Sequence, residues 1–280
     1  MEKKFIPSKM RKAAYPLLAC VGLAVLSLGA TYKSAEEIDN VRFVSEFKNV
    51  EKKTVLLNNQ DHVLPLKGLE KLRIASINLG SSYASTFDSL LNKYTEVQSY
   101  TSTAYKGDSL SMVDLLDELK FKSTVIVQVT DKSLNDPETL QFLLDNQKNK
   151  QLVVVLLGHA RSLAKLNEIT APVILTDHSE AAANFSAQLI FGGVGAKGVL
   201  STTVSPSFTK GAGYVTQKTR LKYTVPEELG INSADLKGID EVALEAIRER
   251  ATPSAVVMVV KDGEVIFNKA YGTHTYEPEA

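Results

Sequence analysis

Apolar runs without polar alternation are the feature that most restricts the fold of this chain. Val125-Ile126-Val127 and Val153-Val154-Val155-Leu156-Leu157 are apolar on both faces of an extended strand. Such strands belong in the interior of a parallel sheet, where helices cover both faces. Helix-like stretches separate these runs along the chain. The sequence therefore predicts an α/β fold with a doubly wound, mostly parallel sheet, an α/β sandwich of flavodoxin-like type.

Strand-like and helix-like stretches alternate from residue 54 to residue 203. The expected strands are Thr54 to Leu57 (followed by the turn residues Asn58-Asn59), Leu72 to Leu79, Glu96 to Tyr100, Thr124 to Thr130, Gln151 to Leu157, Pro172 to Thr176 and Gly198 to Thr203. The expected helices are Ser34 to Lys53, Tyr83 to Lys93, Ser111 to Leu119, Pro137 to Lys148, Arg161 to Leu166 and Ser179 to Phe191. Asp136 before Pro137 is typical of a helix start, because Asp caps the first turn and proline suits its first position.

Charge and composition exclude several classes of protein. The chain has 280 residues, of which 44% are hydrophobic and 23% charged, and its 32 basic and 32 acidic residues balance. A neutral globular chain has no electrostatic footprint for nucleic acid, so we expect no nucleic-acid partner. It has a single cysteine, and none of its four histidines is paired at metal-ligand spacing. We therefore expect no internal disulfide, no metal and no cofactor.

The N-terminal segment is typical of an export signal. Residues 1–12 carry five basic residues and one acid, and the apolar stretch from Ala13 to Leu28 follows. This stretch is shorter than the roughly 20 residues of a spanning helix. We expect residues 1–30 to be a signal peptide that directs export to the periplasm or cell envelope. The alternative is an inner-membrane anchor formed by residues 13–29, and we expect membrane contact only through this segment. Cys20 lies inside the apolar stretch, so we do not expect a lipoprotein cleavage site there.

Three segments are expected between the N-terminal segment and residue 230. Residues 31–49 are predicted to be a helical linker, and residues 50–204 the α/β domain. Residues 205–230 are predicted to be a second linker with little core of its own, because Ser205-Pro206 and Gly211-Ala212-Gly213 are turn and loop signals.

The last segment, residues 231–280, has a different pattern. A helix from Asn232 to about Arg250 precedes two strands, Ala255 to Val260 and Glu264 to Ala270. The Asp262-Gly263 turn between these strands suits a tight hairpin, which requires positive φ angles. One helix and one hairpin bury little apolar surface by themselves. We therefore expect residues 231–280 to be undocked and less stable than residues 50–204.

Several short motifs occur in a particular order along residues 50–230. They are Thr54 to Asn59 with Val63 to Lys67, then Arg73 to Ile77, then Phe191-Gly192-Gly193 with Gly198 to Thr203, and finally Thr219 to Tyr223 with Pro226 to Gly230. In this order and spacing they resemble the C-terminal α/β-sandwich domain of glycoside hydrolase family 3, and the last pair resembles its end in exported bacterial members.

The C-terminal segment resembles a second family. The helix that ends before Thr252-Pro253-Ser254-Ala255 and the hairpin from Val256 to Tyr271 are similar to the start of a serine β-lactamase-related domain. Fusions of these two families occur among exported bacterial hydrolases, and this chain resembles one. The resemblance implies that residues 231–280 are a truncated α+β stub of a β-lactamase-like domain.

The catalytic groups implied by these resemblances are not expected in this chain. Family 3 enzymes are retaining glycosidases that carry a catalytic Asp on a barrel domain before the α/β domain. A barrel needs at least ~200 residues, whereas only residues 30–50 lie between the signal and the α/β domain, and residues 231–280 contain no Ser-x-x-Lys motif. We expect a truncated member of an exported fusion family that joins a glycosidase (β-N-acetylhexosaminidase or β-glucosidase-like) to a serine hydrolase and acts in carbohydrate metabolism. This chain alone is expected to have no catalytic residues and no activity.

Two alternatives to this hypothesis stay open. One is a non-catalytic carbohydrate-binding or assembly module that docks onto a separate barrel domain. The other is the product of a fragmented or internally deleted gene.

Four polar residues at strand ends are the candidate ligand-binding residues. Asn78, Asp131, His159 and Asp177 all fall at the carboxyl ends of expected strands. Ligands of open α/β sheets bind outside these ends, and a glycan is the expected ligand. The alternative is that these side chains cap helices and satisfy turns. The glycine-rich run 192–198 leads from a helix into a strand, so it predicts a turn rather than a phosphate-binding loop.

Overall fold

A six-stranded sheet forms the centre of the molecule. The computed structural model describes residues 34–101, 105 and 111–276. The strands are β1 (Val55–Leu57), β2 (Ile74–Leu79), β3 (Val97–Thr101), β4 (Thr124–Thr130), β5 (Gln151–Leu157) and β6 (Val173–Thr176), in the order β1-β6-β5-β4-β2-β3. All neighbours are parallel except β1, which runs antiparallel to β6. The predicted α/β class with a mostly parallel sheet is confirmed.

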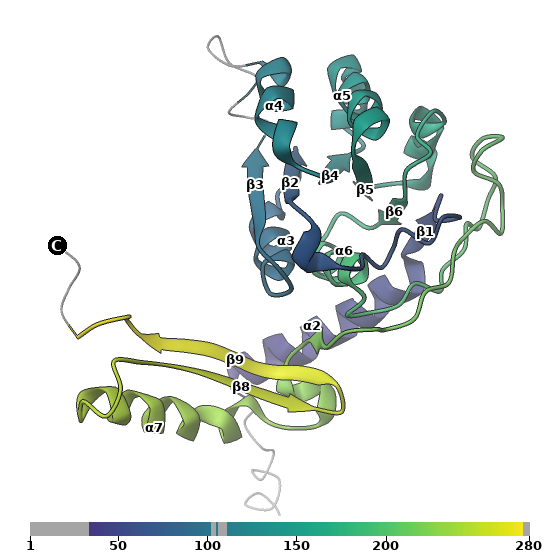
Figure 1. Ribbon diagram of the computed structural model, residues 1–280. Helices are drawn as coiled ribbons and strands as arrows, with labels where there is room; N and C mark the ends of the chain where they lie inside the picture. Colours follow the sequence, from purple (N-terminus) through teal and green to yellow (C-terminus); the bar gives the residue numbers. More distant parts are fainter. Residues whose placement is uncertain (1–33, 102–104, 106–110, 277–280) are drawn as a thin grey trace, which may run out of the picture.

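Helices cover both faces of this sheet (Figure 1). On one face lie α2 (Ala35–Lys53), α3 (Ala84–Leu91) and α6 (Glu180–Phe191), and on the other lie α4 (Met112–Glu118), α5 (Pro137–Asn149) and a 3-10 helix, Ala160–Leu166. Each face has its own core: Val125 and Val127 belong to the core beneath α4 and α5, whereas Ile126 belongs to the other. Both faces of β4 are therefore buried, which explains why its run Val125-Ile126-Val127 does not alternate with polar residues.

Most element boundaries agree with the sequence, and two expectations are wrong. The bounds of β4 and β5 match those predicted, and the Asp136 side chain caps α5 by accepting a hydrogen bond from the Glu138 N–H (3.0 Å). Residues 160–166 form a 3-10 helix instead of an α-helix. The strand expected at residues 198–203 is absent, apart from an isolated bridge between Val55 and Gly198. The chain folds back there, because Leu200 exchanges hydrogen bonds with the backbone of residues 211 and 212 instead of a sheet strand.

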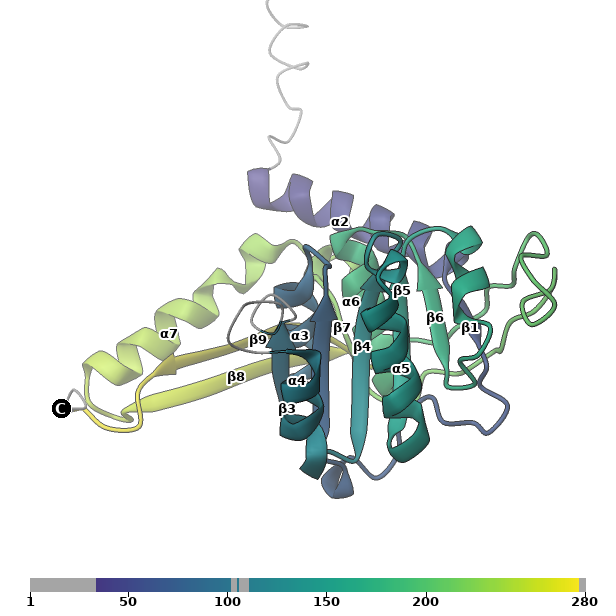
Figure 2. The ribbon, with the colours of Figure 1, turned by 90° about the horizontal axis from the view of Figure 1, so that it is seen from above.

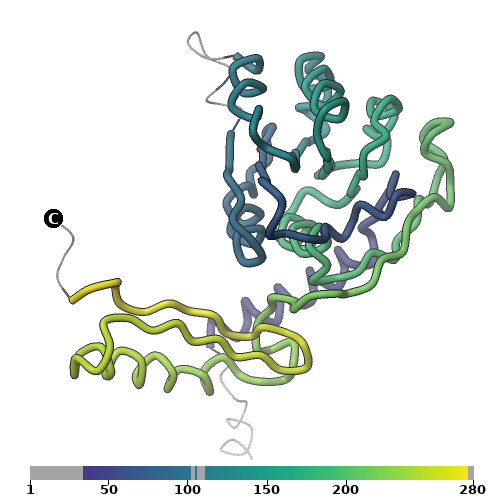
Figure 3. The backbone as a smooth tube through the Cα atoms, viewed as in Figure 1, coloured from purple at the N-terminus to yellow at the C-terminus, as the bar shows by residue number. Residues whose placement is uncertain are grey.

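The segment after α6 is irregular but packed against the α/β unit. Figure 3 shows it in green, running along the side of the sheet toward the C-terminal part. Phe208 is fully buried in the core beneath α4 and α5. The guanidinium of Arg220 donates hydrogen bonds to the carbonyl oxygens of Leu66 and Phe191. We expected residues 205–230 to contribute little to the core, and the burial of Phe208 shows that this expectation is wrong. The boundaries of the domains stay a prediction.

Residues 222–276 form a separate layered unit, which we call the arm. It contains β7 (Lys222–Tyr223), α7 (Lys237–Arg248), β8 (Ser254–Lys261) and β9 (Glu264–Gly272), with a sheet order of β7-β9-β8. The hairpin turn has φ angles of 53° at Asp262 and 77° at Gly263, as the Asp-Gly pair predicts. Helix α7 covers one face of the hairpin, where the Tyr271 hydroxyl donates a hydrogen bond to Asp240 (2.6 Å).

The base of the arm is docked on α2. Glu227 accepts hydrogen bonds from the Asn40 side chain (2.9 Å) and from the Ser233 hydroxyl (2.6 Å), and Lys237 lies 3.6 Å from Glu36. The expectation that residues 231–280 would be undocked is therefore wrong. Local patterns in that segment carry no information about α2, which lies almost 200 residues away along the chain.

The N-terminal predictions fall outside the described residues. The signal peptide 1–30, the alternative anchor 13–29 and Cys20 all belong to this part. Within residues 34–101, 105 and 111–276, no helix combines the length and the apolar character needed to cross a membrane.

Candidate functional site

The carboxyl ends of the parallel strands meet at one edge of the sheet. Strand β2 lies between β3 and β4, and the chain continues from β4 to β5 and β6, away from β3. The strand order therefore reverses between β2 and β4, which is where open α/β sheets bind ligands. Asp131 directly follows β4, and His159 follows the neighbouring strand β5.

The structure brings two of the four predicted residues together. Oδ2 of Asp131 lies 2.5 Å from Nδ1 of His159, and Oδ1 accepts hydrogen bonds from the His159 N–H (3.0 Å) and the Ser162 hydroxyl (2.6 Å). Asn78 instead forms a local turn with both its amide atoms bonded to Ser81. Asp177 forms an exposed ion pair with Lys53 (3.1 Å). Asn78 and Asp177 are thus engaged away from the Asp131–His159 pair.

The charge state of this pair follows from its environment. Burial raises the pKa of Asp131, but the hydrogen bonds from His159 and Ser162 together outweigh it and hold the pKa below its usual value. The ionised carboxylate favours the imidazole tautomer with the proton on Nδ1. The His159 side chain is 70% exposed, and its Nε2 has no hydrogen-bond partner among the described residues. The pair therefore presents an oriented ring nitrogen that can accept a hydrogen bond or a proton.

Two further residues shape this site and were missed by the sequence analysis. An added Cβ at Gly158 would lie 2.4 Å from Oδ1 of Asp131, so only glycine leaves room for the carboxylate. Ser162 lies in the 3-10 helix that His159 begins. The three-residue spacing of His159 and Ser162 was the available signal, because a 3-10 turn places residues i and i+3 on one side.

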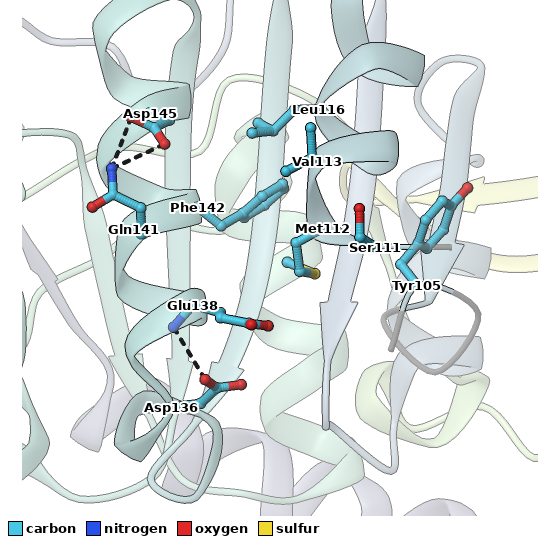
Figure 4. A pocket seen from close by; sticks show the side chains of 10 residues that line it. All are labelled: Tyr105, Ser111, Met112, Val113, Leu116, Asp136, Glu138, Gln141, Phe142 and Asp145. Atoms are coloured by element: carbon cyan, nitrogen blue, oxygen red, sulfur yellow. Dashed lines mark hydrogen bonds between the residues drawn. The ribbon is translucent and has the colours of Figure 1, made fainter. Parts of the chain in front are cut away.

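A cavity of about 620 Å³ lies between α4 and α5, beside the same sheet edge (Figure 4). Apolar side chains line its floor and one wall: Met112, Val113, Leu116 and Phe142. Carboxylates from α5 line the other side, and Asp145 is held there by Gln141 at 3.0 Å. Hydrogen bonds from Gln141 and Lys148 hold the pKa of Asp145 below its usual value.

Tyr105 closes one end of this cavity. Burial and its hydrogen bond with Glu118 raise the pKa of Tyr105 to about 12, so the hydroxyl stays protonated. None of the four predicted site residues lines the cavity, because no local pattern marks the space between two helices. Among the described residues, no group of three or more His, Cys, Asp or Glu side chains is placed to hold a metal ion.

Comparisons with known proteins give distant structural matches. No family model matches the chain, and no curated protein matches it. A β-glucosidase from Listeria innocua, in complex with isofagomine, is 15% identical over 63% of this chain, with a TM-score of 0.47. A fungal multi-domain glycoside hydrolase family 3 β-N-acetylglucosaminidase is 16% identical over 52%, with a TM-score of 0.44.

A β-glucoside phosphorylase, BglX, is 15% identical over 52% of this chain, with a TM-score of 0.39. The chain covers 29%, 17% and 28% of the Listeria, fungal and BglX structures, less than a third of each.

Proposed function

We propose that this chain is the α/β domain of a glycoside hydrolase system of family 3 type, and that it binds a glycan beside a catalytic barrel. The observation that carries the proposal is the Asp131–His159 pair, which presents a free imidazole nitrogen at the ligand-binding edge of the sheet. The ordered motifs from Thr54 to Tyr223 and the mostly parallel sheet support the family assignment. Export through residues 1–30 and a β-lactamase-related origin of residues 231–280 belong to the same proposal.

The chemistry of the pair suits a sugar hydroxyl. Ionised Asp131 keeps the proton on Nδ1 of His159, so that Nε2 accepts a hydrogen bond from the hydroxyl group of a ligand. The role that we propose for His159 is therefore binding and orientation of the sugar.

Turnover by this chain alone is not part of the proposal. Among the described residues, no serine, threonine or cysteine side chain is hydrogen-bonded to the His159 ring. Retaining glycoside hydrolysis requires two carboxylates about 5 Å apart across the scissile bond. We expect purified protein to hydrolyse neither chromogenic β-glycosides nor nitrocefin. Turnover that disappears in Asp131→Asn would overturn this part of the proposal.

The ring signals of the histidines in NMR spectra test the binding role directly. We expect titration with cellobiose or chitobiose to shift the ring signals of His159 saturably while those of His62 and His274 stay in place. Asp131→Asn removes the carboxylate that fixes the proton on Nδ1 of His159. We expect this variant to bind the disaccharide about tenfold more weakly, which corresponds to the loss of one good hydrogen bond. His62→Gln is the matched control, because His62 is exposed and lies outside the site. If neither disaccharide shifts the His159 signals, the binding role is wrong.

A further inference from the structure

Strand β8 has an unpaired edge. In the order β7-β9-β8 it is the outer strand, and within the described residues it pairs with β9 alone. Residues 254–260, Ser-Ala-Val-Val-Met-Val-Val, contain no charge and no proline. Most exposed edge strands carry such residues, which prevent pairing with other chains. This edge is therefore open to a further strand.

Large apolar side chains lie exposed along this edge. Val256, Met258 and Val260 are 73%, 47% and 43% exposed. Val256 and Met258 lie on the face opposite α7, because their neighbours Val257 and Ala255 pair with Lys269 and Tyr271, whose side chains bond to Asp240 of α7. Figure 2 shows the arm projecting to one side of the six-stranded sheet, which leaves the outer part of β8 accessible.

The arm would gain stability from another strand. Strand β7 has two residues, so the arm sheet is little more than the β8–β9 hairpin. A lone hairpin is marginal and needs further strands or a packed helix for independent stability; here α7 covers one face of the hairpin and leaves the edge of β8 unpaired. The chemistry of β8 favours a partner strand that is itself apolar and uncharged.

We propose that β8 pairs antiparallel with β8 of a second copy of this chain, about a two-fold axis at Val257. This register pairs all seven uncharged residues, with Ser254 of one copy opposite Val260 of the other. Lys261 of each copy then lies beyond the paired stretch, so no like charges face each other. The strand is complementary to itself, and the two arms form one continuous sheet of six strands.

A charge exchange at the edge tests this pairing. In the proposed register Val256 of one copy faces Met258 of the other, so Val256→Glu/Met258→Glu places like charges opposite each other, as does Val256→Lys/Met258→Lys. By sedimentation equilibrium we expect wild type at twice the 30.5 kDa chain mass and each variant at the chain mass. We expect the dimer of each variant to weaken by at least about tenfold, and an equimolar mixture to recover dimers.

The matched control is Val242→Lys. Val242 is 69% exposed on α7 and lies away from the edge, so this variant should dimerise like wild type. Circular dichroism checks that all variants are folded. A wild-type monomer at high micromolar concentration, or charged variants that dimerise as tightly as wild type, would overturn the proposal.

A cysteine at the axis tests the register. In a Cys20→Ser background, Val257→Cys places two thiols directly opposite, within the Cα separation that a disulfide spans. We expect a covalent dimer after mild oxidation of Val257→Cys and none from Val260→Cys, which faces Ser254. The reverse result would show that β8 does not pair in this register.

Discussion

The ammonium group of Lys222 lies 4.9 Å from the centroid of the Phe47 ring. Lys222 begins β7, and Phe47 is buried in α2, so this contact joins the arm to the α/β unit. The same Nζ lies 2.5 Å from Glu228 and 3.7 Å from Glu264, and the Lys222 side chain is only 10% exposed. A buried ammonium that neutralises carboxylates from two other segments holds the base of the arm together.

Removal of the Lys222 ammonium should destabilise the protein. Burial raises the pKa of Glu228, but hydrogen bonds from Lys222 and Thr224 outweigh it and keep this carboxyl ionised. Lys222→Ala leaves that buried charge without its partner, so we expect a loss of about 3 kcal/mol in the free energy of unfolding. Urea denaturation at neutral pH measures it.

Two variants control this experiment. Lys210→Ala changes an exposed lysine and should alter stability by less than about 0.5 kcal/mol. Lys222→Met/Glu228→Gln removes both charges of the Lys222–Glu228 pair. This double variant should be more stable than Lys222→Met alone, which leaves Glu228 ionised without its partner. Equal stability of those two variants would mean that the ion pair does not hold the arm.

Asp131 should make stability depend on pH in the acid range. Its folded pKa lies below the ordinary value of 3.8, so the ionised form stabilises the fold above pH 3.8, and this contribution is lost as the pH falls through the folded pKa. We expect Asp131→Asn to be less stable than wild type by about 1 to 2 kcal/mol at pH 7. The difference should shrink below pH 3.8. His159 is the titratable group facing Asp131, so the effect of Asp131→Asn on stability is measured again in a His159→Gln background. A stability difference that grows as the pH falls would contradict a lowered pKa of Asp131.

Gly158→Ala should disrupt the Asp131–His159 pair without touching either residue. The new Cβ would lie 2.4 Å from Oδ1 and 2.7 Å from Cγ of Asp131, so the carboxylate must move away from Ser162 and the His159 N–H. We expect a loss of about 1 to 3 kcal/mol. We also expect a shift of the His159 ring signals in NMR spectra. Unchanged signals would show that the carboxylate keeps its place.

Gly238→Ala is expected to have the opposite effect. Gly238 lies in α7, and an added Cβ would meet no atom within 4 Å. Alanine restricts the unfolded chain and favours the helix, so the free energy of unfolding should rise by up to about 1 kcal/mol. Thermal unfolding followed by circular dichroism measures this. A lower melting temperature would show that this face of α7 is covered.

The local sequence pattern was sufficient to predict an element where neighbours along the chain decide the environment of each residue. The bounds of β4 and β5 followed from runs that are apolar on both faces, and the start of α5 followed from Asp136 and Pro137. The same reasoning failed at residues 198–203, which have a strand-like pattern. There the hydrogen bonds of Leu200 go to residues 211 and 212, and no local pattern specifies that choice.

The candidate site shows most clearly which features follow from local sequence pattern and which depend on tertiary packing. The sequence by itself placed Asp131 and His159 at strand ends, because periodicity locates the end of a strand. Their meeting, 28 residues apart in the chain, required β4 and β5 to be neighbours in the sheet. The room for the carboxylate at Gly158 and the burial of Lys222 against Phe47 likewise depend on packing between distant segments. Periodicity is a property of neighbouring residues, whereas the contacts that orient His159 and dock the arm form only when the chain is folded.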